Sequence, residues 1–588
     1  MTVPAERTAA RWRIPSRTGF SVPRPLAAAP IYFWIGAIVL APMVLLALYS
    51  LWNSEGGQIV HEWSLDNYSD VLGDETYRLL IVKTLYTAFG ACALAALIAY
   101  PMAYFASFKL GKYRLLAVLL VVIPLWVSLL MRVFGWKIIL GENGVINSGL
   151  EQLGLISEPL SALLYTRGSV VVTMMYVAIP FVFICAYTAL ERIPHSLIEA
   201  SSDSGATPSQ TFRQVVWPLS KQGAAMGFAL ASLVALGDYL TPSLVGGLDG
   251  TMVGSVIASQ FGLAGNWSLG AAMAIVLLVV VAVLLVVLAR VTRAKGVLES
   301  TAEERPRPQG RGPAWYAGRI LFALPYAFLY APLLAIAVFS FNDSPVQALP
   351  LEGFTTAWYS EMFESEEIMD ALQRSLLVSG GAVAIAAVVG TAFALLLDSF
   401  RLRGGAAIQA LLAVPVLLPG IVLGIALAIL FRELQLDPGL RNVLIGHASF
   451  VTPVVMLIVY SRLKRMDPSY AQASMDLGAN RFATFRHVVF PELRMALLGA
   501  CLLGFTLSFD EIIITYFLTG NEPTLPVYVW NQLRFGFTPA INAIFVCIAV
   551  FSLLLLLIGM RLLRKAEIDA LDPGAPQSAL LPGAVAEG

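Results

Sequence analysis

The sequence predicts an all-α membrane protein that crosses the bilayer twelve times, as two homologous halves of six helices each. Composition is the first reason, because 58% of the 588 residues are apolar, only 13% are charged, and the mean hydropathy is +0.76. Soluble domains are far more polar. The second reason is a set of twelve apolar stretches, each long enough for a spanning helix of about 20 residues. The third is an internal repeat of the sequence itself.

The twelve stretches form two groups of six, separated by a polar segment rich in Pro and Arg that we interpret as a cytoplasmic linker over 297–318. The halves then cover 31–296 and 319–566, with cytoplasmic tails at 1–30 and 567–588. The expected spans are 31–51, 79–107, 115–140, 168–192, 222–245 and 268–290, then 320–341, 371–398, 405–432, 442–464, 495–520 and 539–562.

Loop charges predict the orientation of these spans. The loops at 52–77 and 342–370 hold six and seven acidic residues and no Lys or Arg, whereas basic residues gather in the alternate loops. Because Lys and Arg are retained on the cytoplasmic side, we expect both termini to be cytoplasmic and the two acidic loops to face outward.

The repeat relates the two halves in parallel. Tyr68 and Tyr359 lie 291 residues apart, as do Pro124 and Pro415, and beyond them the offset becomes 273. The first half therefore carries 18 extra residues, which we place in an outer loop around "GENGVINSGLEQLGLISEPL". An even number of spans gives both halves the same orientation, about an axis along the membrane normal. A substrate path between the halves follows from this arrangement.

One loop is repeated far more closely than the others. At the offset of 273, residues 199–218 and 472–491 agree at 11 of 20 positions. The residue pattern predicts a helix, a bend at Gly205 or Gly478, and a second helix in each loop. A loop that merely lies on the membrane surface is the alternative, but amphipathicity alone does not require the same Gly, Phe and Arg at the same offsets.

Two further features of the loops lead to expectations. Phe212 and Phe485 give each second helix an apolar face, which we expect to need a partner. Pro218 and Pro491 are expected to break the chain before the next span.

The spacing of these loops resembles the EAA loop of binding-protein-dependent ABC importer permeases. Glu-Ala-Ser at 199, Gly205 and "VVWP" follow that pattern, and so do Gln-Ala-Ser at 472, Gly478 and "VVFP". Ser in place of the second Ala, and Gln472 in place of Glu, depart from it. The resemblance implies that each loop couples the permease to an ATPase subunit through these residues: Glu199, Ala200, Ser201, Gly205, Phe212, Arg213, Gln472, Ala473, Ser474, Gly478, Phe485 and Arg486.

The resemblance covers nearly all of 31–565. The chain looks like a fusion of the two permease subunits of spermidine/putrescine-type transporters. It implies the type I ABC importer fold in a bacterial inner membrane, surrounded by lipid. It also implies an ATPase homodimer that binds ATP and Mg²⁺, an extracytoplasmic solute-binding protein as the second partner, and no cofactor in this chain.

Nothing in the sequence predicts a catalytic, metal or nucleic-acid site. No phosphate-binding Gly-x-x-x-x-Gly-Lys-Ser/Thr motif occurs, and "SGG" at 379–381 lies in an apolar span, where small residues serve helix packing. The four cysteines and four histidines lack ligand spacing. We therefore expect a transporter and not an enzyme.

Acidic residues inside two spans predict a substrate path. A charge in a span costs about 2.5–3.5 kcal/mol on insertion scales, so such groups usually face a cavity or each other. Asp238 and Glu511 are related by the offset of 273, and Asp510 adjoins them. A negative patch here suits an ammonium group, to which aromatic rings add cation–π contacts. The path expected from these residues comprises Asp238, Tyr239, Ser508, Asp510, Glu511 and Trp358.

Alternatives remain open at this stage. The acids could bond to helix termini as structural groups, the outer aromatics could form an interfacial belt, and Arg132 and Lys137 would favour anions or zwitterions. Related importers carry opines, amino-acid derivatives, phosphonates, thiamine or ferric iron. An ion-coupled secondary transporter can also have twelve spans in two repeats.

Overall fold

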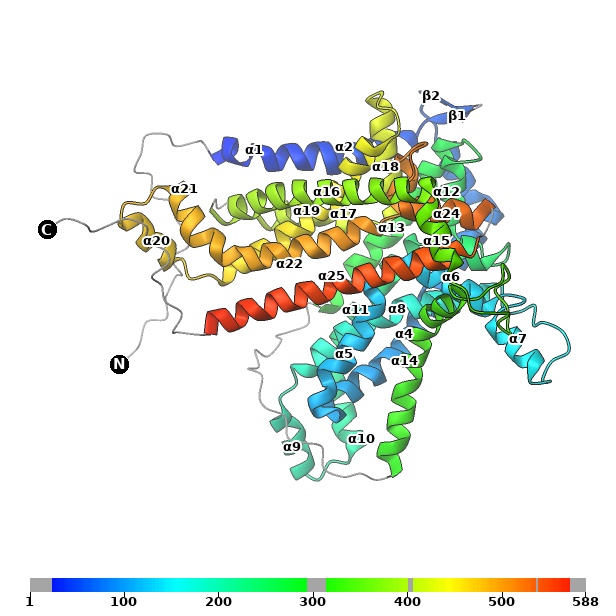
Figure 1. Cartoon of the computed structure of the whole chain (residues 1–588). Helices are drawn as coiled ribbons and strands as arrows, with labels where there is room; N and C mark the ends of the chain where they lie inside the picture. The colour runs from blue at the N-terminus through cyan, green and yellow to red at the C-terminus, as the bar shows by residue number, and fades with distance from the viewer. Residues whose placement is uncertain (1–23, 56, 293–312, 400–404, 536–537, 572–588) are drawn as a thin grey trace.

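A computed structural model describes residues 24–55, 57–292, 313–399, 405–535 and 538–571. Most of the predicted tails at 1–30 and 567–588, and most of the linker at 297–318, lie outside these residues. The regular secondary structure of the described residues is helical except for one isolated bridge and a hairpin of β1 (Asn53–Glu55) and β2 (Gln58–Val60), in which Asn53 pairs with Val60. The predicted all-α class is confirmed (Figure 1).

The first half contains the helical segments α1 to α13. They are α1 (Arg24–Trp34), η1 (Ile35–Leu40), α2 (Ala41–Tyr49), α3 (Asp66–Gly73), α4 (Glu75–Lys109), η2 (Gly111–Tyr113), α5 (Arg114–Val122), η3 (Ile123–Trp126), α6 (Leu129–Leu140), α7 (Val145–Gln152), α8 (Arg167–Glu191), α9 (His195–Asp203), α10 (Pro208–Thr211), η4 (Phe212–Val216), α11 (Trp217–Gly237), η5 (Pro242–Gly246), α12 (Val253–Phe261) and α13 (Trp267–Thr292).

Within the described ranges, the second half repeats the order of the longer helices and has no counterpart of α7. It contains α14 (Pro313–Phe339), α15 (Ala357–Glu364), α16 (Glu366–Ser399), α17 (Gly405–Leu417), α18 (Gly420–Glu433), α19 (Leu440–Arg465), α20 (Ser469–Asp476), α21 (Arg481–Thr484), η6 (Phe485–Val489), α22 (Phe490–Phe509), α23 (Ile513–Leu518), α24 (Leu525–Phe535) and α25 (Ala540–Leu571).

Two of the expected spans are sharply bent. Among the described residues ten helices are long and apolar enough to cross a membrane, and two bent pairs raise the count to twelve. The bent pairs replace the spans expected at 115–140 and 405–432, and their angles are 93° and 99°. Val127 is extended at the first bend, and Pro419, which cannot continue a helix ladder, lies at the second. The apolar runs locate both segments but do not reveal the bends, because each run continues through its bend.

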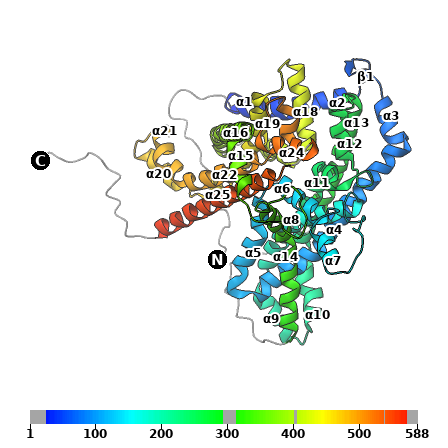
Figure 2. The same cartoon turned by 45° about the vertical axis from the view of Figure 1, so that its right-hand side comes forward.

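The first helix of each half packs on the other half. Trp34 of the first half meets Phe393 of the second with ring centroids 5.9 Å apart, and the Tyr49 hydroxyl donates to Glu433 at 2.5 Å. In the second half, Tyr326 of α14 donates to the carbonyl of Ala117 at 3.1 Å. Figures 1 and 2 show α1 beside α16 and α14 beside α5 and α8. This exchange of helices ties the two halves together.

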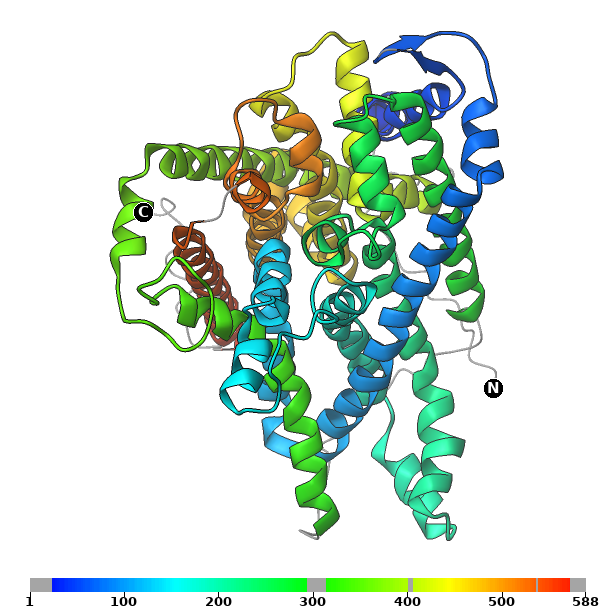
Figure 3. The same ribbon diagram turned by 90° about the vertical axis from the view of Figure 1, so that its right-hand side faces the viewer.

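The two halves form arms that diverge from a common end. In Figure 1 one arm carries α9 and α10 at its tip, and the other carries α20 and α21. The common end contains α6, α12 and α24, and Figure 3 shows it facing the viewer with the β1–β2 hairpin at its upper edge. The two loops that match in sequence therefore lie far from each other and from the end where the halves meet.

Candidate coupling loops and transport path

The loop between α8 and α11 has the predicted form of helix, glycine bend and helix. Gly205 follows α9 with φ at +82°, where glycine is favoured because it lacks a Cβ atom. α10 then begins with a capping box, in which the side chains of Thr207 and Gln210 each bond the other's backbone N–H. The bend and the start of the second helix are thus set by local residues.

The matching loop between α19 and α22 has the same form with different caps. Gly478 has φ at +94°, and the Asn480 side chain accepts from the N–H of Ala483 at 2.8 Å. At the start of α20, the Ser469 N–H donates to Asp467 at 2.9 Å and holds the pKa of that carboxyl below its ordinary value. The prediction of a glycine bend is confirmed in both halves.

A hydroxyl pair closes each loop. The hydroxyls of Ser201 and Thr211 lie 2.9 Å apart, and those of Ser474 and Thr484 lie 3.1 Å apart. Both serines stand where the resembled pattern has Ala, and both threonines are buried. The departure from the pattern therefore has a structural reason, since each serine bonds its first short helix to its second.

The apolar face of each second helix packs inside its own half. Phe212 lies 5.8 Å from the Tyr104 ring and 6.2 Å from the Tyr100 ring, both on α4, and Phe485 lies 6.0 Å from Phe490. The expected partner of the Phe212 face lies on α4 of the same half, whereas the ring that Phe485 contacts belongs to the helix that continues directly from η6. The exposed predicted coupling residues are Glu199, Ala200, Gly205, Arg213, Ala473, Gly478 and Arg486, whereas Ser201, Phe212, Gln472, Ser474 and Phe485 are partly buried.

Large apolar side chains on the second loop were not singled out from the sequence. Tyr470, Leu477 and Phe482 are 63%, 89% and 72% exposed. At the offset of 273, Ser204 and Ser209 stand in place of Leu477 and Phe482 in the first loop. The sequence does contain a signal for this patch, because three large apolar residues in an otherwise polar loop are unusual.

The loops continue into the spans without a break, contrary to expectation. Pro218 and Pro491 lie in the first turn of α11 and α22, and the residues just before them form the wider π-helical turns η4 and η6. A π turn moves the backbone carbonyl with which the proline ring would clash, so the helix continues across the proline. The second short helix and its span together form one helix of 30 residues, Pro208–Gly237, in the first half.

That continuous helix ends at the intramembrane acids. Asp238 accepts from the N–H groups of Leu240 and Thr241 at 2.9 and 3.0 Å, and the Thr241 hydroxyl also donates to it. Glu511 accepts from the N–H of Ile514 at 2.9 Å. The offset of 273 relates Thr241 to Ile514 as well as Asp238 to Glu511. Both carboxylates therefore cap the chain after a helix break, in the role that we left open as an alternative.

Asp510 connects the two halves. Its carboxylate accepts from the N–H of Leu129 at 3.1 Å, at the bend where α6 begins. At the offset of 273, Gly237 of the first half corresponds to Asp510 of the second. Gly237 packs against the bend of the second half, where a Cβ on it would lie 2.6 Å from the Cβ of Pro419. The two equivalent contacts between the halves thus differ: Asp510 caps the start of α6, whereas Gly237 packs closely on Pro419.

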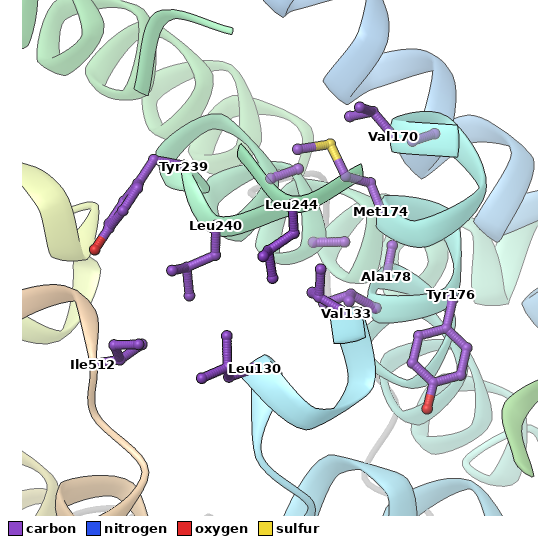
Figure 4. Packing of buried hydrophobic residues seen from close by; sticks show 14 of the residues in the cluster. Leu130, Val133, Val170, Met174, Tyr176, Ala178, Tyr239, Leu240, Leu244 and Ile512 are labelled. Carbon is purple, nitrogen blue, oxygen red and sulfur yellow. The ribbon is translucent and has the colours of Figure 1, made fainter. Parts of the chain in front are cut away.

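Apolar residues pack across the junction of the halves beside the acids, and one buried cation lies near the acids among the described residues. Figure 4 shows Ile512 of the second half opposite Leu130 and Leu240 of the first. Arg132 is only 6% exposed, its Nε donates to the carbonyl of Ser128 at 3.4 Å, and it interacts electrostatically with Asp238 and Asp510. Lys137 is partly exposed on the same helix. Asp238 is buried, while Asp510 and Glu511 are partly exposed.

The other predicted path residues have diverse partners. Ser508 bonds Nδ1 of His447 at 2.7 Å, and Nε2 of that histidine lies 2.8 Å from the Thr515 hydroxyl. Sequence reasoning missed His447, although a lone ionisable group in an apolar span is itself a signal. Tyr239 packs among aromatic rings of the second half. Trp358 donates to the carbonyl of Asn342 at 2.8 Å, so its bonded partner lies in its own loop rather than at the acids.

Comparison with known proteins places both halves in one family. The model of the binding-protein-dependent transport system inner membrane component matches residues 18–294 and 388–567. The spermidine/putrescine permease protein PotC of Escherichia coli is 33% identical over 240 residues, which are 41% of this chain and 90% of PotC. The putrescine permease protein PotI of Escherichia coli is 34% identical over 233 residues, covering 38% of this chain and 83% of PotI.

A third permease relative and a solved structure are similar as well. The spermidine/putrescine permease protein PotB of Haemophilus influenzae is 32% identical over 269 residues, which are 46% of this chain and 93% of PotB. Among solved structures, a bacterial alginate ABC transporter in complex with an alginate-bound periplasmic protein aligns over 45% of this chain and 92% of its own, at 18% identity and a TM-score of 0.37. Each permease relative thus matches less than half of the present chain.

Proposed function

Because this chain belongs to the family of binding-protein-dependent transport system inner membrane components, we propose that it supplies both membrane halves of an ATP-driven polyamine importer. The relatives named for spermidine and putrescine support this substrate class, and each is matched over most of its own length. A secondary transporter, the alternative from another class, is not favoured by this family. The chain is a transport protein rather than an enzyme.

The pair of matching loops is the observation that carries the ATP-driven mechanism. In our proposal an ATPase dimer binds 194–217 and 467–490 on the cytoplasmic side and hydrolyses ATP with Mg²⁺, while a solute-binding protein delivers polyamine to the opposite face. Both chain termini would then be cytoplasmic. Two loops with the same bend and the same hydroxyl pair suit two identical ATPase subunits.

The continuous helices provide the mechanical link. The helix Pro208–Gly237 runs from the loop to the break at Asp238, a length of about 45 Å at 1.5 Å per residue. Movement of the ATPase subunits would therefore displace the helix ends where the halves meet. In this mechanism, the loops approach each other on ATP binding and the path between the halves opens to the opposite side.

Reconstitution tests the proposal directly. The chain would be placed in liposomes with its ATPase and binding protein, and uptake of radiolabelled spermidine would be followed with and without ATP. We expect uptake that requires ATP and the binding protein and that survives an ionophore. Uptake driven by an ion gradient without ATP would contradict the proposal, and so would ATP-driven uptake of another solute with no competition by spermidine or putrescine.

A further inference from the structure

His447 of α19 contacts the second half on both sides of the break between α22 and α23. Its Nδ1 lies 2.7 Å from the hydroxyl of Ser508, near the end of α22, and its Nε2 lies 2.8 Å from the hydroxyl of Thr515 on α23. Between these two contacts along the chain lie Asp510 and Glu511, which belong to neither helix. One imidazole ring therefore connects the two helices that the break separates.

The hydrogen bonds around the ring assign its donor and its acceptor. The Thr515 hydroxyl donates its single hydrogen to the carbonyl of Glu511 at 2.7 Å, so toward His447 it accepts. Nε2 of the ring is therefore the donor. In a neutral imidazole the other nitrogen is then an acceptor, and Nδ1 accepts from the hydroxyl of Ser508. Both ring nitrogens thus have a defined role, which an apolar side chain cannot reproduce.

Close packing of the three helices holds this contact in place. The three bonded side chains are at most 2% exposed. A Cβ on Gly446 of α19 would lie 2.6 Å from the side chain of Leu518 on α23, and a Cβ on Gly504 of α22 would lie 2.7 Å from that of Val451 on α19. The two glycines let α19 approach both neighbours, so that one ring reaches a hydroxyl on each. A buried polar group that loses its partner is costly, which favours this arrangement.

The first half holds its equivalent break in another way. At the offset of 273, the three positions of the histidine contact are occupied by residues without a hydroxyl or an imidazole, namely Met174, Ala235 and Pro242. Instead, the Asp238 carboxylate accepts from the Thr241 hydroxyl and from backbone N–H groups beyond the break. In the second half Ile514 stands in place of Thr241 and has no hydroxyl for Glu511. The histidine contact therefore takes the place of the contact between acid and hydroxyl.

The break of the second half lies between its coupling loop and the end where the halves meet. One helix of 29 residues, Arg481–Phe509, runs from the loop to the break, and α23 and α24 follow beyond it. A few residues at the end of an element can absorb a movement as a hinge. A break without a cross-link would let α22 move while α23 stays in place. A third helix bonded to both sides opposes this.

We propose that His447 is a positioning residue of the transport cycle, which transmits movement of α22 across the break to α23. The inference rests on the proposed importer function and deepens it, because it assigns the mechanical connection of the second half to one side chain. Without the ring, the break acts as a hinge. The ATPase then still hydrolyses ATP, but less of the movement reaches the end where the halves meet.

The number of spermidine molecules imported per ATP hydrolysed tests this role in liposomes that contain the chain, its ATPase and its binding protein. His447→Met gives the second half the residue that the first half has at this position. Uptake per ATP should fall about tenfold, as expected for the loss of two buried hydrogen bonds, while ATP hydrolysis continues. A loss of folded protein would instead lower uptake and hydrolysis together and leave their ratio unchanged.

Two amide variants separate the two bonds of the ring. Asparagine places its amide near the position of Nδ1 and glutamine near that of Nε2, so His447→Asn keeps the bond to Ser508 and His447→Gln keeps the bond to Thr515. Each should show a ratio between those of His447→Met and the wild type. Thr515→Val should lower the ratio less in His447→Asn than in the wild type, because His447→Asn has already lost that bond.

A buried hydroxyl on the same helix provides the matched control. Ser449 is fully buried on α19, and its hydroxyl donates to the carbonyl of Gly446 at 2.6 Å, within its own helix. Ser449→Ala should therefore leave uptake per ATP unchanged. The proposal is overturned if His447→Met keeps the wild-type ratio or if Ser449→Ala loses as much. If His447→Met is not recovered as a folded protein, a wild-type ratio in both amide variants overturns it.

The wild-type importer separates failure of this role from failure of the function. ATP-driven uptake of spermidine by the wild type, together with an unchanged ratio in the His447 variants, overturns the positioning role and leaves the polyamine importer standing. Absence of ATP-driven uptake by the wild type overturns the importer assignment and the positioning role together.

Discussion

At the residue scale, the acids in the spans act as caps as well as charges. Asp238 and Glu511 each accept backbone N–H groups just beyond a helix break, and Asp510 accepts one from the other half. A buried carboxylate gains several hydrogen bonds in this way, which offsets its desolvation. Because Asp510 and Glu511 are still partly exposed, capping does not remove them from a transport path.

Substitution of Asp510 separates its two roles. Asparagine caps a helix about as well as aspartate, so Asp510→Asn should keep the free energy of unfolding, whereas Asp510→Ala should lose about 1 kcal/mol. Thermal unfolding of the purified chain measures this difference. If uptake falls in Asp510→Asn while its stability is unchanged, the charge serves transport. Equal loss of stability in both variants would contradict the capping role.

At the element scale, each candidate coupling loop depends on a glycine in a left-handed conformation. A Cβ on Gly205 or Gly478 would meet no atom within 4 Å, so only the backbone conformation requires glycine there. The loop itself is short and exposed, and the span that follows is continuous with it. A local change of bend should therefore redirect the loop without disturbing the spans.

Alanine at these bends should uncouple the importer. Gly205→Ala or Gly478→Ala costs about 1 kcal/mol in the left-handed region, and we expect weaker binding of the ATPase and slower ATP-driven uptake. Binding of the ATPase to the reconstituted chain gives the first measurement and uptake the second. Gly499→Ala is the control, because Gly499 lies inside α22 and a Cβ there would also meet no atom within 4 Å. Normal coupling in both bend variants would refute this role of the glycines.

At the scale of the whole molecule, the exchange of helices joins two halves that each match the same family. PotB and PotC are relatives that match less than half of this chain each. α1 and α2 pack on the second half and α14 packs on the first, through contacts such as Tyr49 with Glu433 and a close approach of Gly135 to Pro332. Each half thus leaves an apolar face that only the other half covers.

Cutting the chain within 297–312 tests this interdependence. Two fragments expressed together should associate and support uptake, whereas either fragment alone should fail to purify as a stable protein, because its exchanged helix has nothing to pack against. Affinity purification through a tag on one fragment, followed by size-exclusion chromatography, provides the measurement. Recovery of each fragment alone as a folded monomer would show that the exchange is unnecessary.

The sequence by itself determined the features that depend on contiguous residues. Apolar runs predicted where the twelve membrane segments lie, and the repeated loop predicted the bends at Gly205 and Gly478 together with the family of the chain. Such signals are local, because a spanning helix, a cap or a positive φ requires only its own neighbours.

Only the tertiary structure decided the partners that are distant in sequence. Asp510 bonds Leu129 across 381 residues and Tyr49 bonds Glu433 across 384, and no local pattern predicts either. The covered face of Phe212, the bends at Val127 and Pro419, and the unbroken helix through Pro218 were likewise decided by packing. An apolar run shows that a segment enters the membrane, but shape and contacts depend on which neighbours satisfy its backbone and fill its surface.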